Sequence, residues 1–119
     1  MLFDLRKEGI KSFSIHNGTI SANPTSQSAA IYHLTRSTVS VSANGNANGI
    51  VWAVENNGTR AVLHAYDANN LAHELYNSNQ ATSNRDHFGP GNKFITPTIA
   101  DGKVFVGTQN SVAVFGLLQ

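Results

Sequence analysis

The sequence contains no cysteine, which excludes both a disulfide framework and a thiolate metal site. Charge is scarce as well: 13% of the 119 residues are charged, and the formal net charge is +1. With so few charges and almost no net charge, the chain lacks the basic surface that binds nucleic acid or an anionic membrane, and we expect neither as a partner. No stretch approaches the roughly twenty apolar residues that a membrane-spanning helix needs, so we expect no membrane span.

An export signal is also not visible in the first residues. Residues 1–8 include two acidic side chains, Asp4 and Glu8, and lack the apolar run of a secretory signal. The residues themselves therefore do not indicate a subcellular location.

What the chain does contain is apolar residues, at 40%, together with many Asn, Ser and Thr side chains. This apolar content is sufficient for one domain to bury a core, and the chain is too short for several domains. Asn, Ser and Thr hydrogen-bond their own backbone in turns and compete with helix formation. The composition therefore favours a loop-rich, all-β fold.

A repeat with a period of about fifty residues runs through the sequence. An aromatic residue between apolar neighbours recurs at Phe13, Tyr66 and Phe115, and a second aromatic position recurs at Trp52 and Phe105. Such a period is typical of propellers and solenoids, in which copies of one unit stack. We therefore interpret the second aromatic position as core between stacked units rather than as the floor of a cofactor site.

Turn signals divide the sequence into short strands. Residues 10–23 are predicted to form a hairpin around Asn17-Gly18, because Asn-Gly is a strong turn signal between apolar residues. Residues 24–37, rich in Ser and Thr, are predicted to run over the surface as a connection between sheets. Further strands, with a long loop at 78–92, are predicted over residues 38–43, 50–55, 61–66, 71–77, 94–100, 103–108 and 111–118.

Two of these predicted strands are apolar on both faces. Residues 50–54 read Ile-Val-Trp-Ala-Val, and residues 104–106 read Val-Phe-Val. A free-standing antiparallel sheet has one polar face, whereas these strands need cover on both faces. The pattern predicts that the sheets stack face to face.

Two segments, residues 62–71 and 94–108, resemble the repeats of quinoprotein-type β-propellers, also described as pyrroloquinoline-quinone-binding-like repeats. In the first segment the resemblance rests on Ala65 and Asp67. In the second it rests on the run Thr-Pro-Thr-Ile-Ala-Asp-Gly-Lys-Val-Phe-Val, which includes Thr96, Pro97 and Gly102. The resemblance implies a partial β-propeller made of four-stranded antiparallel meander blades.

The sequence departs from the family pattern at other positions. Leu71 stands where the family has Gly and Leu75 near its Trp, while Val114 and Gly116 replace the Ala and Asp in the last copy. The resemblance therefore implies the fold more strongly than the cofactor, and we assign no cofactor.

The resemblance also implies how the chain is divided. Residues 1–37 would hold the end of a preceding blade and a connection, residues 38–77 a complete blade, and residues 78–119 a long loop and a three-stranded final blade. Because propellers of this family commonly have about seven or eight blades, we expect a C-terminal fragment of a longer propeller.

Relatives are generally exported, which suggests an exported or periplasmic location although the chain shows no signal peptide.

Such a fragment would have open strand edges and an uncovered blade face. We expect it to bury them by self-association or against the missing blades of a longer propeller. A further possibility is that the N-terminal hairpin folds back onto residues 111–118 and closes the broken blade.

The chain has five histidines, His16, His33, His64, His73 and His87. Only His64 and His73 are predicted to be near neighbours, across one hairpin, and two imidazoles without a third ligand do not make a catalytic zinc site. We therefore expect exposed strand histidines and no metal site.

Other polar groups also have structural interpretations. Arg85-Asp86 is predicted to form an ion pair that holds the long loop. Asp67, followed by Asn69-Asn70, is predicted to form an Asx turn rather than a calcium site. Two matches to glycosylation acceptors, Asn17-Gly18-Thr19 and Asn57-Gly58-Thr59, are better explained as hairpin turns.

No residue is thus assigned a catalytic, cofactor-binding or metal-binding role, and we expect no enzymatic activity. The first hypothesis is a non-catalytic β-propeller fragment with a scaffolding or protein-interaction role. The alternatives are a part of a quinoprotein dehydrogenase-like propeller, which saturable binding of pyrroloquinoline quinone and calcium would favour, or a truncated gene product without its own activity.

Overall fold

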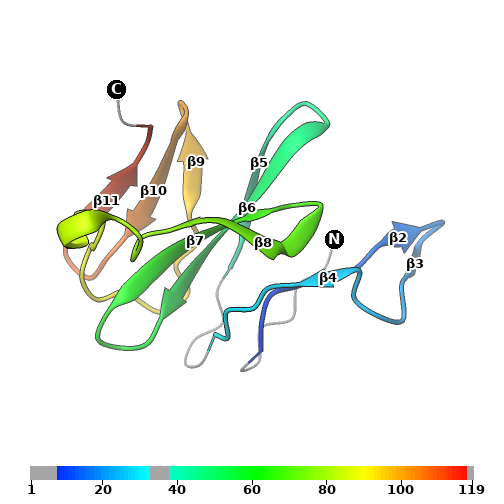
Figure 1. Ribbon diagram of the computed structural model, residues 1–119, viewed down its shortest axis with the longest axis horizontal. Helices are drawn as coiled ribbons and strands as arrows, with labels where there is room; N and C mark the ends of the chain where they lie inside the picture. Colours follow the sequence, from blue (N-terminus) through cyan, green and yellow to red (C-terminus); the bar gives the residue numbers. More distant parts are fainter. Residues whose placement is uncertain (1–7, 33–37, 118–119) are drawn as a thin grey trace.

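The structure is a computed structural model that describes residues 8–32 and 38–117. Over these ranges the regular elements are β-strands and one short 3-10 turn, η1 (Thr82–Asn84) (Figure 1). The strands of each described sheet pair antiparallel, and none of these sheets is closed. The prediction of an all-β fold is confirmed.

The centre of the molecule is a four-stranded antiparallel meander, which we call the central sheet. Its strands pair in chain order and are β5 (Ser40–Asn44), β6 (Ala47–Asn56), β7 (Ala61–Asp67) and β8 (Asn70–Asn77). The β6–β7 connection turns at the predicted site, where Oδ1 of Asn57 accepts hydrogen bonds from the backbone N–H groups of Thr59 and Arg60 at 3.2 and 2.9 Å. The four strands predicted between residues 38 and 77 are therefore confirmed.

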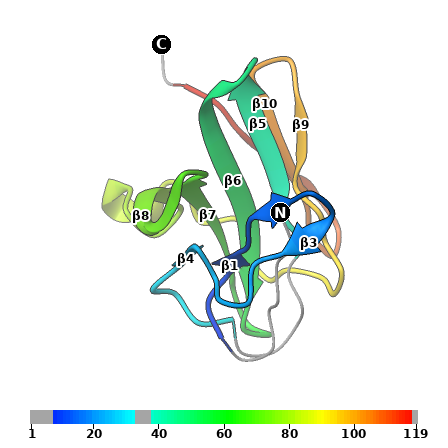
Figure 2. The same cartoon turned by 90° about the vertical axis from the view of Figure 1, so that its right-hand side faces the viewer.

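A second antiparallel sheet of three strands, the C-terminal sheet, packs against one face of the central sheet (Figures 1 and 2). Its strands in spatial order are β9 (Thr98–Ala100), β10 (Lys103–Gly107) and β11 (Val112–Phe115). Asp101 and Gly102 form the tight β9–β10 turn with left-handed φ values of 50° and 67°, which is typical of a type I′ turn. Strand β9 is shorter than predicted, since Phe94 has a left-handed φ of 61° and Pro97 cannot donate to a ladder.

The N-terminal segment makes two small strand pairs. Strand β1 (Lys11–Ser12) pairs with β4 (Ser26–Gln27), and β2 (Ile15–His16) pairs with β3 (Thr19–Ile20). Asn17 and Gly18 join β2 to β3 with φ values of 48° and 76°. The predicted Asn-Gly turn is confirmed, but its hairpin is shorter than the predicted range 10–23, because β1 pairs with β4 instead. The hairpin projects from the rest of the chain (Figure 1).

The prediction of a surface connection over residues 24–37 holds only in part for the described residues 24–32: five of them are exposed, but the segment also contributes a strand and buried side chains. Strand β4 lies within this segment, and Ser28 and Tyr32 are buried. The Ser28 hydroxyl accepts a hydrogen bond from the backbone N–H of Ile10 at 2.8 Å. Serine in this segment satisfies buried backbone groups instead of marking the surface, which composition alone does not distinguish; residues 33–37 lie outside the described part.

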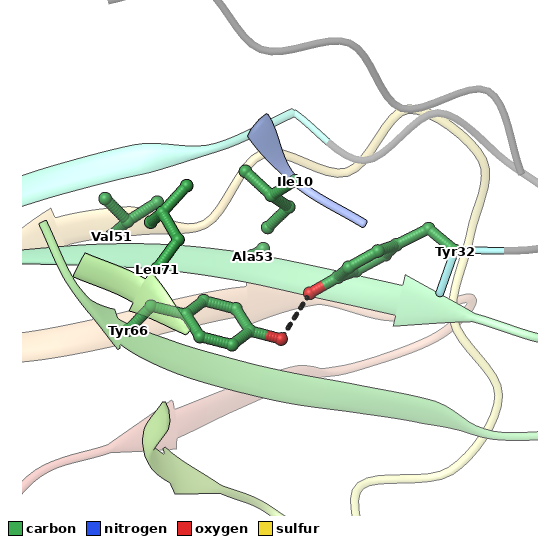
Figure 3. Close-up of a cluster of buried hydrophobic side chains, with 6 residues drawn as sticks. All are labelled: Ile10, Tyr32, Val51, Ala53, Tyr66 and Leu71. Atoms are coloured by element: carbon green, nitrogen blue, oxygen red, sulfur yellow. Dashed lines mark hydrogen bonds between the residues drawn. The ribbon is translucent and has the colours of Figure 1, made fainter. Parts of the chain in front are cut away.

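Both faces of the central sheet are covered, as predicted from residues 50–54. Because side chains alternate along a strand, neighbouring residues of β6 and β7 point into two different cores. The first core lies under the N-terminal segment and contains Ile10, Tyr32, Val51, Ala53, Tyr66 and Leu71 (Figure 3). The second core lies between the two sheets and contains Val54, Ala61, Leu63, Val104 and Val106, with Trp52, Ile99, Ala113 and Phe115 packed against it.

The N-terminal segment does not fold back onto the final strand. It places Ile10 and Tyr32 in the first core, on the face of the central sheet opposite to the C-terminal sheet. Its strand β4 lies beside β8, where the backbone N–H of Leu71 donates to Oγ of Ser26 at 3.1 Å. The fold-back possibility is therefore wrong, because the first core already requires this segment as its cover.

Candidate functional site

The recurring aromatic positions occupy matching places in the two sheets. Trp52 and Phe105 each lie in the second strand of their sheet, and Tyr66 and Phe115 each lie in the third. Phe13 lies between β1 and β2, outside both sheets. The two sheets thus repeat each other in the order of their strands and in the position of their aromatic residues.

The match extends to the direction in which these side chains point. Tyr66 lies in the first core, on the face of the central sheet that looks away from the C-terminal sheet. Phe115 lies on the corresponding face of its own sheet, in the second core, and stacks edge-on with Phe88 of the long loop at a centroid distance of 5.4 Å. Trp52 lies on the other face of the central sheet, where the C-terminal sheet covers it.

Phe105 occupies the position that corresponds to Trp52, but its surroundings differ. Its neighbours Val104 and Val106 point into the second core, so by alternation Phe105 points to the opposite, outer face of the C-terminal sheet. There it pairs across the strands with Val114, which is 53% exposed, and Val112 on the same face is 63% exposed. We call Phe105, Val112 and Val114 the outer apolar face.

Strand β11 forms one edge of the C-terminal sheet. Within residues 8–32 and 38–117, β11 pairs with β10 alone. The N–H of Thr108 donates to the carbonyl of Ser111 at 2.8 Å at the turn between these strands. Hydrogen-bonded and non-hydrogen-bonded pairs alternate in an antiparallel ladder, so the backbone groups of Val112 and Val114 point away from β10.

The other residues that carry the family resemblance hold the framework of the sheets. Ala65 is buried and pairs with Trp52, and the side chain of Asp67 accepts the backbone N–H of Asn69 at 2.9 Å in the predicted Asx turn. Pro97 is buried, and its carbonyl accepts a hydrogen bond from the hydroxyl of Ser40, which joins β5 to the segment before β9. Two members of this set are exposed, Thr96 and Gly102.

A buried polar cluster is centred on His64, in β7. The residue is 5% exposed; Nδ1 of its ring lies 2.5 Å from Oε1 of Glu74 in β8, and Nε2 lies 3.1 Å from Oε2 of Glu55 in β6. The ring stacks on Tyr66 at a centroid distance of 5.8 Å and meets Tyr32 edge-on at 5.7 Å. The prediction of an exposed strand histidine is wrong here, because the N-terminal segment covers this face.

This cluster links three strands and leaves neither ring nitrogen free. Ionised carboxylates only accept hydrogen bonds, so either both nitrogens of His64 carry protons or one carboxyl group does. A nitrogen already paired with a carboxylate is not open to an incoming substrate. The arrangement therefore fits a structural clamp across β6, β7 and β8 better than a catalytic base.

Two tyrosines complete the polar part of the first core. The hydroxyl oxygens of Tyr32 and Tyr66 lie 3.1 Å apart (Figure 3). Burial raises the pKa of Tyr66 to about 12, and burial together with the charge of an ionised Tyr66 raises the pKa of Tyr32 well above its ordinary value. Both hydroxyl groups are therefore protonated and paired at neutral pH.

The predicted Arg85–Asp86 ion pair is present, but it joins adjacent residues, and the contact that ties the long loop to the central sheet is the one between Asp86 and Tyr76. Nε and an η-nitrogen of Arg85 contact the two carboxylate oxygens of Asp86 at 2.7 and 3.0 Å. The Tyr76 hydroxyl, on β8, donates to the same carboxylate at 2.7 Å. The hydrogen bonds from Arg85 and Tyr76 lower the pKa of Asp86, while burial and the hydrogen bond to Asp86 raise the pKa of Tyr76.

The other described histidines do not converge on His64. His73 lies 3.8 Å from a carboxylate oxygen of Asp67 and is exposed, so it is not a cross-strand neighbour of His64, which pairs with Asn77. His16 is exposed in β2, and His87 contacts Arg60; His33 lies outside the described residues. Among the described residues, no group of three or more His, Asp or Glu side chains has an arrangement that could hold a metal ion.

Sequence reasoning missed Glu55, Glu74 and Tyr32. The position of Glu55 could have been predicted from the sequence. The four-residue turn at 57–60 places Glu55 on the same face of the sheet as His64, in a diagonal cross-strand position. Glu74 depends on register shifts between β7 and β8, and Tyr32 depends on a long-range contact. Neither of these can be read from local pattern.

The described part of the chain contains no helix of the length and apolarity that crossing a bilayer requires. Comparisons with protein-family models, with curated proteins and with solved structures gave no match to this chain.

Proposed function

We propose that this chain is a non-catalytic partial β-propeller that serves as a protein-interaction module, and that it accepts an added β-strand at the open edge of the C-terminal sheet. The observation that carries the proposal is the edge strand β11, which pairs on one side only within the described residues. Strand addition to an exposed edge is a general mode of recognition, in which backbone hydrogen bonds supply affinity and side chains supply specificity.

The repeat supports the propeller part of the proposal. Two successive meanders stack face to face, and their matching aromatic residues lie on matching faces. Their first strands, β5 and β9, lie side by side, and Ser40 bonds to the carbonyl of Pro97 between them. Face-to-face stacking of meanders around their first strands is the arrangement of propeller blades.

The chemistry of β11 supports the interaction role. Natural edge strands are usually protected by charged side chains, prolines or bulges. Residues 111–116 read Ser-Val-Ala-Val-Phe-Gly and contain neither a charge nor a proline. A fourth strand at this edge would give the C-terminal sheet the same number of strands as the central sheet.

The non-catalytic part of the proposal is supported by how the polar groups are used. His64 has both nitrogens engaged, and Asp86 is engaged by Arg85 and Tyr76. These groups bind parts of the fold to one another. An open backbone edge beside an apolar face is a surface for a polypeptide rather than for a small reactive substrate.

The test uses a fluorescently labelled, uncharged peptide of alternating Thr and Val as a generic strand probe. It is titrated with the full chain at low micromolar concentration and followed by fluorescence anisotropy. We expect saturable binding that is weakened by Val112→Pro, a change that removes an outward N–H at the first position of β11, where proline is tolerated. Binding that is absent, or that is equal for the chain and its Val112→Pro variant, would contradict the proposal.

A further inference from the structure

We propose that the strand accepted at the open edge is β11 of a second copy of this chain, paired antiparallel about a two-fold axis at Ala113. This inference rests on the proposed function, and it names the partner. The resulting dimer would join two C-terminal sheets into one six-stranded sheet in the order β9-β10-β11, then the β11-β10-β9 of the second copy.

The backbone geometry selects the register. Within β11, the outward N–H and C=O groups belong to Val112 and Val114, one on each side of Ala113. An antiparallel copy centred on Ala113 pairs Val112 of each chain with Val114 of the other. Both outward donors and both outward acceptors of each strand are then used, and the contact is isologous, as a two-fold axis requires.

The side chains near the axis also suit a second copy. Ala113 points toward the second core and is small, so two such residues can meet in a close, non-hydrogen-bonded pair without overfilling the inner face. On the outer face, each exposed valine of one strand meets a valine of the other. Aliphatic cross-strand pairs of this kind stabilise a sheet.

Charge does not oppose this self-pairing. A symmetric contact brings each charge close to its own copy, so an edge rich in Lys or Glu would repel itself. No ionisable side chain occurs from residue 104 to residue 117. Strand β11 therefore carries no charge of its own that would repel a second copy, and the nearby cation, Lys103 of β10, lies beside Gly116 and away from Ala113.

The pairing of short edge strands buries less than a standard interface, so we expect a dimer that dissociates in the micromolar range or above. Sedimentation velocity should show a concentration-dependent mass change from monomer to dimer. Val112→Pro should raise the dissociation constant by about 30-fold, since each copy loses one outward donor. Val114→Lys should raise it by about tenfold or more through like-charge repulsion.

The matched control is Val41→Lys. Val41 lies on β5 and is 52% exposed, against 53% for Val114, so it controls for adding the same charge at a similarly exposed strand valine. It should leave the dissociation constant unchanged. A dimer that is weakened equally by the lysines at 41 and 114 would overturn the inference.

A single introduced cysteine tests the register, because the chain has none of its own. Ala113→Cys should cross-link into a covalent dimer under mild oxidation, since the facing residues of a non-hydrogen-bonded pair lie within the Cα distance range of a disulfide. Ser111→Cys should not, because its two copies would lie about 14 Å apart along the strands. Cross-linking through Val114→Cys instead of Ala113→Cys would overturn the register.

These results separate the inference from the proposed function. A chain that stays monomeric at all concentrations but binds the strand peptide would overturn the homodimer and leave the interaction module intact. A chain that neither dimerises nor binds the peptide would overturn both. A dimer that survives Val112→Pro and Val114→Lys would place the contact elsewhere, for example at the exposed Ile15–Ile20 pair of the projecting hairpin, and would also overturn the inference.

Discussion

Nδ1 of His64 lies 2.5 Å from Oε1 of Glu74, and this contact joins the third strand of the central sheet to the fourth. The other ring nitrogen of His64 reaches Glu55 on the second strand, so one side chain ties three strands together. The other carboxylate oxygen of Glu74 accepts a hydrogen bond from the Asn77 amide at 2.9 Å. The relationship explains why a polar residue occupies a buried position in β7.

Glu74→Gln should destabilise the chain by about 1–3 kcal/mol, because it weakens a charge-assisted hydrogen bond to a buried ring. Urea unfolding followed by circular dichroism measures the change. Glu8→Gln is the control: the side chain of Glu8 is exposed and pairs with the nearby Lys11, and exposed pairs contribute about 0–1 kcal/mol. If both variants lose the same free energy of unfolding, the contact between Glu74 and His64 does not stabilise the fold.

The paired tyrosines predict a loss of stability in alkaline solution. The pKa of Tyr66 is raised from 10.0 to about 12 in the folded chain, so the unfolded state loses its proton first as the pH rises. The contribution of the raised pKa is fully present below pH 10 and is lost as the pH rises through about 12. The free energy of unfolding, measured from pH 9 to pH 12, should fall over this range.

Variants of this tyrosine pair check the cause of the alkaline loss. Tyr66→Phe should cost about 1–3 kcal/mol at neutral pH, because the buried hydroxyl of Tyr32 loses its partner. Replacing both tyrosines by phenylalanine should cost less than that single change, and it should flatten the alkaline slope. If the slope is unchanged in the double variant, the buried pair is not its source.

Asp86 predicts the opposite behaviour in acid. Its pKa is lowered in the folded chain by the hydrogen bonds from Arg85 and Tyr76, so its contribution is present above its ordinary pKa of 3.8 and is lost as the pH falls through the lower, folded value. Asp86→Asn should therefore reduce the free energy of unfolding at pH 7, and the difference from the unchanged chain should shrink below pH 4. Asp101→Asn, at a 95% exposed side chain, should show no such difference at any pH.

Two glycines, one crowded and one open, allow a controlled test of the packing between the long loop and the central sheet. A Cβ at Gly91 would lie 2.9 Å from Cβ of Ala61 and 3.2 Å from Cγ of Asn56, whereas a Cβ at Gly107 would meet nothing within 4 Å. Gly91→Ala should cost about 1–3 kcal/mol by overpacking. Gly107→Ala should be neutral or stabilise by up to about 1 kcal/mol through the unfolded state. Thermal unfolding of both variants tests the difference, and similar melting temperatures would contradict it.

The sequence was most informative where local signals determine structure. The Asn57-Gly58 turn, the apolar alternation between residues 38 and 77, and the two-sided apolar pattern of residues 50–54 predicted a sheet covered on both faces. The Arg85–Asp86 pair was predictable because it is local. These features depend on neighbours in the chain or on one turn.

Features that depend on distant segments could not be predicted from local pattern. The burial of His64 and Ser28 requires the N-terminal segment to lie over the central sheet, and polar residues give no sign of this from their own position. The late start of β9, at Thr98 instead of residue 94, follows from the left-handed backbone at Phe94. For His64 and Ser28, long-range packing outweighed the usual preference of the residue type for the surface.

The most direct test of the open edge is amide hydrogen exchange along β11, followed by NMR in dilute and in concentrated solution. In dilute solution, Val112 and Val114 should exchange rapidly, while Ala113 and Phe115, whose amides point toward β10, should be protected. In concentrated solution the two valine amides should become protected as well, as an added strand pairs with them. Slow exchange of Val112 and Val114 in the dilute chain would contradict the account, because it would show that this edge is already closed.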